Sequence, residues 1–287
     1  MAPTWIEVAL NGRWGSERQP GSPTTVDAAI EQGVACVDAG AAIVHVHAYD
    51  TGTEVDDPDV YARIIEGIQE RVDAIVYPTK PSPGIDLSGS MDPTAQFATH
   101  DELGRRGLLE CSVVDPGSIN STTYEAIERD EPGDVYLNPE ANVRKGLAVA
   151  ARHGSNPSYA IYEPGFIRLG AALADRIPDL PTPIYRFMFS DRFTFNYPPE
   201  PYALESLHRL LTEEAGDAPW MLSGLGVDIT PLIPHAVDRG GHVRVGLEDA
   251  PLGTDRTNVG WVEHASREIE AAGGTVASVA DVREALS

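Results

Sequence analysis

The segment DAGAAIVHVHAYD, residues 38–50, passes from the end of one predicted helix into a short apolar strand. We expect the helix over Thr24–Ala39, because Thr24 or Thr25 can cap its N-terminus. The strand is expected at Ile43–Ala48. Similar apolar runs recur along the chain, each separated from the next by a longer amphipathic stretch. Strands that alternate with helices in this way predict a parallel sheet.

The whole chain of 287 residues divides into eight such units. The other predicted strands are Trp5–Asn11, Ala74–Pro78, Leu108–Val114, Tyr159–Tyr162, Ile184–Phe189, Trp220–Ser223 and Val243–Leu247. The other predicted helices are Val60–Arg71, Thr122–Glu128, Asn142–His153, Phe166–Asp175, Ala203–Glu213, Leu232–Asp238 and Arg256–Ala271. Eight strand–helix units predict an α/β protein, a single (β/α)8 TIM barrel that covers residues 1–287 as one domain. An open, doubly wound sheet is the alternative.

The chain carries 44 acidic and 21 basic residues, which gives a formal net charge of −23. This charge argues against nucleic acids and anionic membranes as partners, because both require a basic surface. A single arginine can still bind an anionic small molecule locally. The two cysteines, Cys36 and Cys111, stand far apart, and no apolar run is long enough for a membrane span or a signal peptide. We therefore expect a cytoplasmic protein.

Two histidines, His45 and His47, lie two residues apart in the predicted strand Ile43–Ala48. Residues two apart on a strand point the same way, so both imidazoles share one face, about 7 Å apart by strand rise. Neutral imidazole is a common zinc ligand, and this spacing allows both rings to bind one cation. The alternative is a pair of hydrogen-bonded histidines in the core.

A third ligand is expected from the segment GGHVRVGLEDAP, residues 240–251, where the last predicted strand meets its loop. Strand alternation places Arg244, Gly246 and Glu248 on one face and Asp249 on the other, unless the strand has already ended. Glycine at position 246 would leave room for a bulky group. A carboxylate would complete a His2Glu set with one open position, as in catalytic zinc sites. The alternative is a surface Arg–Glu pair that caps the next helix.

The segments ALNG (9–12), DAGAAIVHVHAYD (38–50) and GHVRVGLED (241–249) together resemble the β-keto acid cleavage enzymes. This family includes 3-keto-5-aminohexanoate cleavage enzyme. The likeness continues through LSGLGVDITPLIPHAVDRGGHVRVGLED (222–249) and VASVADVREAL (276–286), so it extends over most of the chain. The resemblance implies a TIM barrel that forms a homotetramer and holds one Zn²⁺ per chain.

The resemblance also implies a reaction in which a β-keto acid and acetyl-CoA give acetoacetate and a new acyl-CoA by a retro-Claisen route. By position, the metal ligands would be His45, His47 and Glu248. Asp249 would be the base that removes the proton next to the ketone, and Arg244 would hold and tune Asp249. The same ligands would also accept other divalent first-row metals.

Several positions depart from the family pattern where substrate contacts are expected. Tyr49 replaces an arginine that normally follows the second metal histidine. Trp14, shortly after the Asn11-Gly pair, replaces a glutamate of members whose substrate carries an amine. A primary ammonium tail is therefore not expected. Trp14 favours an apolar tail, a quaternary ammonium held by cation–π attraction, or plain packing.

Three further positions bear on the substrate pocket. Ala160 falls where the family has a glutamate that supports the Arg–Asp pair. Thr79 replaces a serine that touches the substrate carboxylate, and Lys80 beside it could add charge. The family's small polar residue on the fourth strand falls at Ser112 or Val113. We expect substrate contacts from Asn11, Trp14, Tyr49, Thr79 and Ser112.

Three hypotheses follow from these patterns. The first is the metal-dependent transfer between a β-keto acid and acetyl-CoA described above. The second keeps the metal and the barrel but cleaves a keto acid without CoA, by an aldolase-like or hydrolytic route, as the altered pocket would allow. The third is an inactive barrel that binds a metal or metabolite, which the loss of the glutamate at Ala160 would explain. Dependence of turnover on acetyl-CoA separates the first two.

Overall fold

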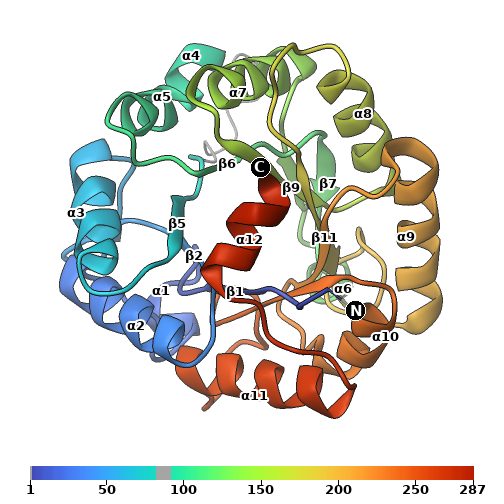
Figure 1. Ribbon diagram of the computed structural model, residues 1–287. Coiled ribbons are helices and arrows are strands. Elements are labelled where there is room, and N and C mark those ends of the chain that lie inside the picture. The colour runs from blue at the N-terminus through green and yellow to red at the C-terminus, as the bar shows by residue number, and fades with distance from the viewer. Residues whose placement is uncertain (1, 82–91) are drawn as a thin grey trace.

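The computed structural model describes residues 2–81 and 92–287. Eight parallel strands form one sheet in the order β5-β2-β1-β12-β11-β10-β9-β6, which curls into a nearly closed barrel with helices around it (Figure 1). The predicted barrel fold is confirmed. The strands are β1 Ile6–Ala9, β2 Ile43–Val46, β5 Ile75–Pro78, β6 Cys111–Val113, β9 Asn156–Ile161, β10 Ile184–Phe189, β11 Trp220–Gly224 and β12 His242–Val245.

The outer helices follow the strands in the expected alternation. They are α2 Val26–Asp38, α3 Pro58–Gln69, α5 Ala98–Arg105, α7 Glu140–His153, α8 Pro164–Ala174, α9 Pro201–Ala215, α10 Ile233–Asp238 and α11 Asn258–Ala271. The side chain of Thr25 caps α2 by accepting a hydrogen bond from the Ala28 N–H. Within the described ranges, no helix combines the length and the apolar composition needed to cross a membrane.

Short elements occupy the loops. They are α1 Gly15–Arg18, the hairpin β3 Tyr49–Asp50 with β4 Thr53–Glu54, α4 Pro93–Gln96, the hairpin β7 Ile119–Ser121 with β8 Asp134–Tyr136, α6 Tyr124–Glu128 and the 3-10 turn η1 Thr230–Leu232. The predicted helix at Thr122–Glu128 is therefore a loop helix between β7 and β8 and not part of the outer ring. The ring helix after β5 is α5, which the sequence did not predict because Leu103 is its one apolar buried side chain.

The C-terminal helix α12, Val279–Leu286, lies across one end of the barrel (Figure 1). Its buried side chains join a cluster of inward-facing residues from the early parts of the strands, including Trp5 and Met221. At the same end the ring of His242 stacks on Trp5 at 3.7 Å, which accounts for this histidine as part of the core. The carboxyl ends of the strands lie at the other end, where TIM barrels build their sites.

Candidate active site

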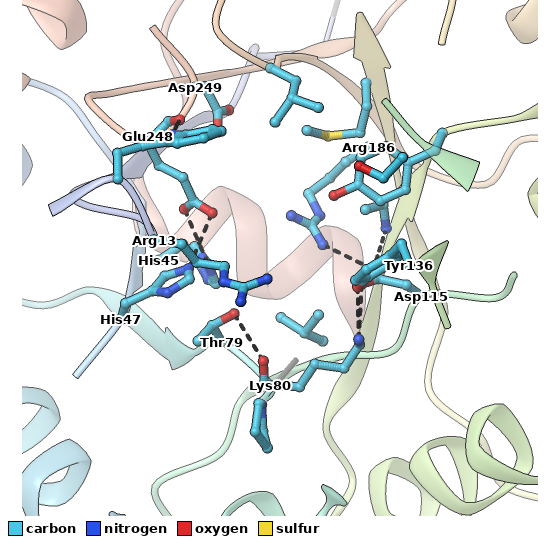
Figure 2. Close-up of a pocket in the computed structure, with 18 of the residues that line it drawn as sticks. Arg13, His45, His47, Thr79, Lys80, Asp115, Tyr136, Arg186, Glu248 and Asp249 are labelled. Carbon is cyan, nitrogen blue, oxygen red and sulfur yellow. Dashed lines mark hydrogen bonds and ion pairs between the residues drawn. The ribbon is translucent and has the colours of Figure 1, made fainter. Parts of the chain in front are cut away.

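A cavity of about 670 Å³ opens at the carboxyl ends of the strands, a size typical of small-molecule sites. Figure 2 shows its lining: His45, His47 and Glu248 lie on one side, and Arg186, Asp115, Tyr136 and Lys80 lie on the other. In the first group, His45 lies on β2, His47 follows the end of β2, and Glu248 lies in the turn after β12. The second group comes from β10 and the loops after β5 and β6.

The structure brings the three predicted metal ligands together. One ligand atom from each of His45, His47 and Glu248 lies within 4.8 Å of the others. The Nε2 of His45 is 3.4 Å from one oxygen of Glu248, and the Nε2 of His47 is 3.2 Å from the other. Two imidazoles and a carboxylate are a donor set that suits zinc and related divalent cations.

A glycine sets the geometry of the segment that supplies Glu248. Strand β12 ends at Val245, and Gly246 adopts a φ of +128°, so strand alternation no longer applies. Glu248 and Asp249 both lie in the turn that follows, and both reach Arg244. A Cβ at Gly246 would lie 2.2 Å from the carbonyl oxygen of Ala9. The expected room for a bulky group at Gly246 is therefore wrong, because the backbone of β1 fills that space.

The predicted Asn11-Gly12 pair shapes the same site without lining the cavity. The Asn11 side chain accepts a hydrogen bond from the His47 N–H at 2.8 Å and donates one to the His47 carbonyl at 3.1 Å. A Cβ at Gly12 would lie 2.6 Å from Cγ of Glu248, so glycine leaves space for this ligand. The hydroxyl of Tyr49 in turn donates to the Gly12 carbonyl at 2.7 Å.

A second carboxylate orients His47. Its Nδ1 lies 2.6 Å from Oε1 of Glu54, which the hairpin β3–β4 brings over the end of β2. This contact holds the Nδ1 proton and leaves Nε2 facing Glu248, the arrangement usual for histidines that bind metals. Glu54 could not be predicted as a site residue from the sequence, because a short hairpin in the loop decides its position.

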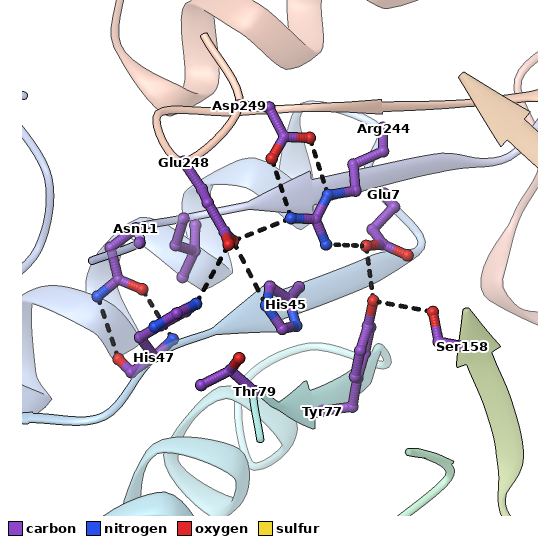
Figure 3. A network of polar contacts seen from close by, with 12 residues as sticks. Glu7, Asn11, His45, His47, Tyr77, Thr79, Ser158, Arg244, Glu248 and Asp249 are labelled. Carbon is purple, nitrogen blue, oxygen red and sulfur yellow. Dashed lines mark hydrogen bonds and ion pairs between the residues drawn. The ribbon is translucent and has the colours of Figure 1, made fainter. Parts of the chain in front are cut away.

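Arg244 lies at the centre of a buried group of four charged residues, called here the Arg244 cluster: Glu7, Arg244, Glu248 and Asp249 (Figure 3). The guanidinium donates two hydrogen bonds to Asp249, at 2.8 and 2.9 Å. It also lies 2.9 Å from an oxygen of Glu248 and donates to Glu7 at 2.9 Å. Three carboxylates therefore surround one guanidinium, and a divalent cation would balance the excess negative charge.

Glu7 is another site residue that sequence reasoning missed. It lies on β1 in direct register with Arg244 on β12, and its side chain is 1% exposed. The hydroxyl of Tyr77 donates to it at 2.7 Å. Glu7 thus supplies from β1 the support for Arg244 whose absence was noted at Ala160 on β9. An ionisable residue inside an apolar strand was the available signal, since glutamate is almost never fully buried unless it is paired.

Burial and charge tune the ionisable groups of the site. Burial lowers the pKa of His45 well below its usual range, so this imidazole is neutral. Burial also acts to lower the pKa of His47, but Glu248 and Glu54 outweigh it and raise that pKa to about 9. Burial acts to raise the pKa of Glu248, but Arg244 and the two histidines outweigh burial and lower this pKa below its usual value. The carboxylate is therefore ionised.

Asp249 behaves differently from Glu248. Burial raises the pKa of Asp249 above its ordinary value, although Arg244 opposes this shift. The hydroxyl of Ser223 donates to Asp249 at 3.0 Å and fixes its orientation. A carboxylate with a raised pKa, held rigidly beside a metal site, suits the removal of a proton from carbon.

Of the other predicted substrate contacts, some line the cavity and one does not. Trp14 and Thr79 line the cavity, and the Trp14 indole N–H donates to the carbonyl of Glu248 at 2.8 Å. Ser112 does not line it; Val113, the next residue of β6, does. Neighbouring residues of a strand face opposite sides, so Val113 and not Ser112 faces the cavity.

The opposite side of the cavity holds what is called here the Arg186 cluster: Lys80, Asp115, Tyr136 and Arg186 (Figure 2). The Lys80 ammonium donates to the Tyr136 hydroxyl at 2.7 Å and lies 3.4 Å from Asp115. Burial lowers the pKa of Lys80, although Asp115 opposes this shift. Asp115 also accepts hydrogen bonds from the Tyr136 hydroxyl and from the backbone N–H of Ala160.

A family model described as beta-keto acid cleavage enzyme matches residues 3–287. The chain belongs to the β-keto acid cleavage enzyme family. The 3-oxoadipate:acetyl-CoA acetyltransferase of Cupriavidus necator is 26% identical over 99% of this chain and 94% of its own length. The 3-keto-5-aminohexanoate cleavage enzyme of Acetoanaerobium sticklandii is 23% identical over 94% of this chain and 92% of its own.

Among solved structures, the apo structure of ObcA superposes on this chain with a TM-score of 0.72 and 16% sequence identity. The match covers 93% of this chain and 65% of ObcA, so the chain spans less than two thirds of that protein. At this identity the likeness concerns the fold. It agrees with the nearly closed eight-stranded barrel described above.

Proposed function

We propose that this protein transfers acyl groups between a β-keto acid and acetyl-CoA, giving acetoacetate and a new acyl-CoA, with one zinc ion per chain. The observation that carries the proposal is the buried Asp249. Its pKa is raised, its orientation is fixed, and it lies next in the chain to Glu248, one of the three residues that could hold a metal. Family membership supports the reaction class. The relative from Cupriavidus necator is named for a reaction between 3-oxoadipate and acetyl-CoA.

His45, His47 and Glu248 would hold the zinc ion. When bound, zinc supplies a Lewis acid that favours removal of the proton between the ketone and carboxylate of the substrate. The neutral His45 and the ionised Glu248 already have the protonation states that metal binding requires, and His47 reaches it by losing one proton.

Asp249 takes the proton from the carbon between the ketone and the carboxylate. That carbon attacks the acetyl thioester and releases the CoA thiolate, which then adds to the substrate ketone. The carbon–carbon bond next to that ketone breaks, so the tail leaves as a new acyl-CoA. Asp249 returns its proton to the departing carbon to give acetoacetate. Arg244 keeps the Asp249 carboxylate aimed throughout, because it holds both oxygens.

A second, shallower hollow supports acetyl-CoA as the co-substrate. It measures about 400 Å³ and includes Arg18, Arg129 and Arg192 in its lining. Arg18 also lines the main cavity, so the two spaces adjoin. Glu125 also lines this hollow and pairs with Arg129 and Arg192, so the arginines outnumber the carboxylates there. The phosphates of CoA would bind here while the thioester enters the main cavity.

The first experiment is metal analysis of tag-free protein together with an acetoacetate assay on β-keto acids with and without acetyl-CoA. We expect about one zinc per chain and product formation that requires acetyl-CoA. Cleavage without acetyl-CoA would favour the aldolase-like or hydrolytic reaction, and metal without any turnover would favour an inactive binding barrel. Light scattering would test the homotetramer that the family resemblance implies.

A further inference from the structure

The cavity side opposite the predicted metal ligands carries the buried guanidinium of Arg186, one N–H donor of which has no partner in the described part of the chain. Strand β10 lies four positions from β2 in the sheet order β2-β1-β12-β11-β10, which is the opposite side of an eight-stranded barrel. Arg186 projects from β10 into the cavity and is 4% exposed. In the Arg186 cluster, Lys80 and Arg186 share one carboxylate, Asp115, as their ion-pair partner among the described residues.

Lys80 has no hydrogen-bonding capacity left for a ligand. An ammonium group has three donors. Those of Lys80 are directed to the Tyr136 hydroxyl at 2.7 Å, to Oδ1 of Asn138 at 2.9 Å and to Asp115 at 3.4 Å. Asp115 is itself occupied by Tyr136, by Lys80 and by a backbone N–H. These residues therefore form a closed group beside Arg186.

Arg186 is the open member of the cluster. A guanidinium has five N–H donors. The contacts of Arg186 with the described residues are one long hydrogen bond to the Ser158 carbonyl, at 3.4 Å, and an ion pair with Asp115 at 3.7 Å. Its Nε has no hydrogen-bond partner in the described part of the chain. A buried donor without a partner is costly, so this side chain is poised for an acceptor from a ligand.

Strand β9, the neighbour of β10, supplies no acidic side chain to Arg186. Arg186 lies in direct register with Ala160 on β9, where a longer acidic side chain would reach its guanidinium. The carboxylate that supports Arg244 instead comes from Glu7 on β1. With alanine at position 160, nothing on β9 neutralises Arg186.

We infer that Arg186 binds a second carboxylate at the far end of the substrate, so that the preferred substrates are β-keto dicarboxylic acids. This inference rests on the proposed function, in which the ketone end of the substrate lies at His45, His47 and Glu248. Arg186, on the opposite side of the cavity, then contacts the far end of the substrate tail. Guanidinium pairs with carboxylate through two parallel hydrogen bonds, which gives both strength and selectivity. The charge also opposes the quaternary ammonium tail considered for Trp14.

The test compares two keto acids of equal length, 3-oxoadipate, which ends in a carboxylate, and 3-oxohexanoate, which ends in a methyl group. We expect kcat/KM with acetyl-CoA to be about 10- to 100-fold higher for the diacid, the range for a hydrogen bond to a charged group. In Arg186→Gln this ratio should fall to near one, and Arg186→Lys should recover part of it. Arg209→Gln, which removes an exposed arginine on α9, should keep the wild-type ratio.

Equal kcat/KM values for the two acids in the wild-type enzyme would overturn the inference. An equal loss on both acids in Arg186→Gln would also overturn it, since Arg186 would then contact a group that all substrates share. Failure of the proposed function gives another result, the absence of acetoacetate from either acid. In that case calorimetry of the two acids with the metal-loaded protein, without acetyl-CoA, still decides the inference: tighter binding of the diacid supports it, and equal Kd values reject it.

Discussion

The two charged clusters of the cavity are built from similar parts but have opposite balances. The Arg244 cluster places three carboxylates around one guanidinium. The Arg186 cluster places two cations around one carboxylate. Burial makes an unbalanced charge costly in both places, so each side of the cavity is completed by what it binds. The side with the Arg244 cluster is therefore suited to bind a cation, and the side with the Arg186 cluster is suited to bind an anion.

The strands beside the two guanidiniums also differ: Glu7 on β1 pairs with Arg244, whereas β9 carries no acidic residue beside Arg186. Glu7 on β1 and position 160 on β9 approach the barrel interior from different directions. Placing the carboxylate on β1 keeps Arg244 neutralised and leaves Arg186 open. The predictions below test these opposite charge balances, from the largest expected effect to the smallest.

The largest effect should come from removing a metal ligand. His45→Ala should leave less than one bound metal per chain and lower kcat by more than about 100-fold, beyond the loss typical for residues that only support a ligand. Metal analysis and the acetoacetate assay measure both. His264→Ala is the matched control, because this histidine lies on α11 and contacts Glu268. Full activity in His45→Ala would rule out this residue as a ligand.

Glu7→Gln should keep the metal but weaken the base. Without the Glu7 charge, Arg244 is free to lower the pKa of Asp249, so kcat should fall about 10-fold or more. The acidic limb of the pH–rate profile should move to lower pH. A loss of thermal stability with an unchanged pH profile would mean that Glu7 serves only the fold. Adding Ala160→Glu should restore part of kcat while it abolishes any preference for diacids.

Metal binding should be coupled to a proton at His47. Because its pKa is raised to about 9, the metal-free protein carries a proton there at neutral pH and must release it to bind metal. Metal affinity should therefore rise with pH and level off as pH passes about 9. Glu54→Gln should move this break to lower pH, because Glu54 helps to raise the pKa. Competition with a coloured chelator at a series of pH values measures the metal affinity. An affinity that does not change with pH would contradict the assignment of this proton to His47.

The smallest effect is expected at the hollow assigned to CoA. Arg192→Gln should raise KM for acetyl-CoA about 2- to 10-fold with little change in kcat, as for loss of one exposed charge-assisted contact. Arg209→Gln serves again as the control. A change in kcat alone would place the CoA phosphates elsewhere.

Local patterns were enough for a large part of these results. Alternating strands and helices predicted the barrel, and the two-residue spacing of His45 and His47 predicted that their rings share a face. These features depend on neighbours in the chain, through strand and helix periodicity. The family resemblance added Glu248 and Asp249 because their motif is contiguous. The same reasoning missed α5, whose short and polar sequence has little periodicity to detect.

The sequence by itself thus determined the barrel and the three side chains, His45, His47 and Glu248, of the candidate metal site. Only the tertiary structure decided how their charges are balanced. Glu7 meets Arg244 across 237 positions of chain, and Arg186 faces an alanine on a neighbouring strand. The physical reason is that hydrogen bonds and ion pairs act over a few ångströms in space, and strand register, which no local pattern encodes, sets which residues come that close.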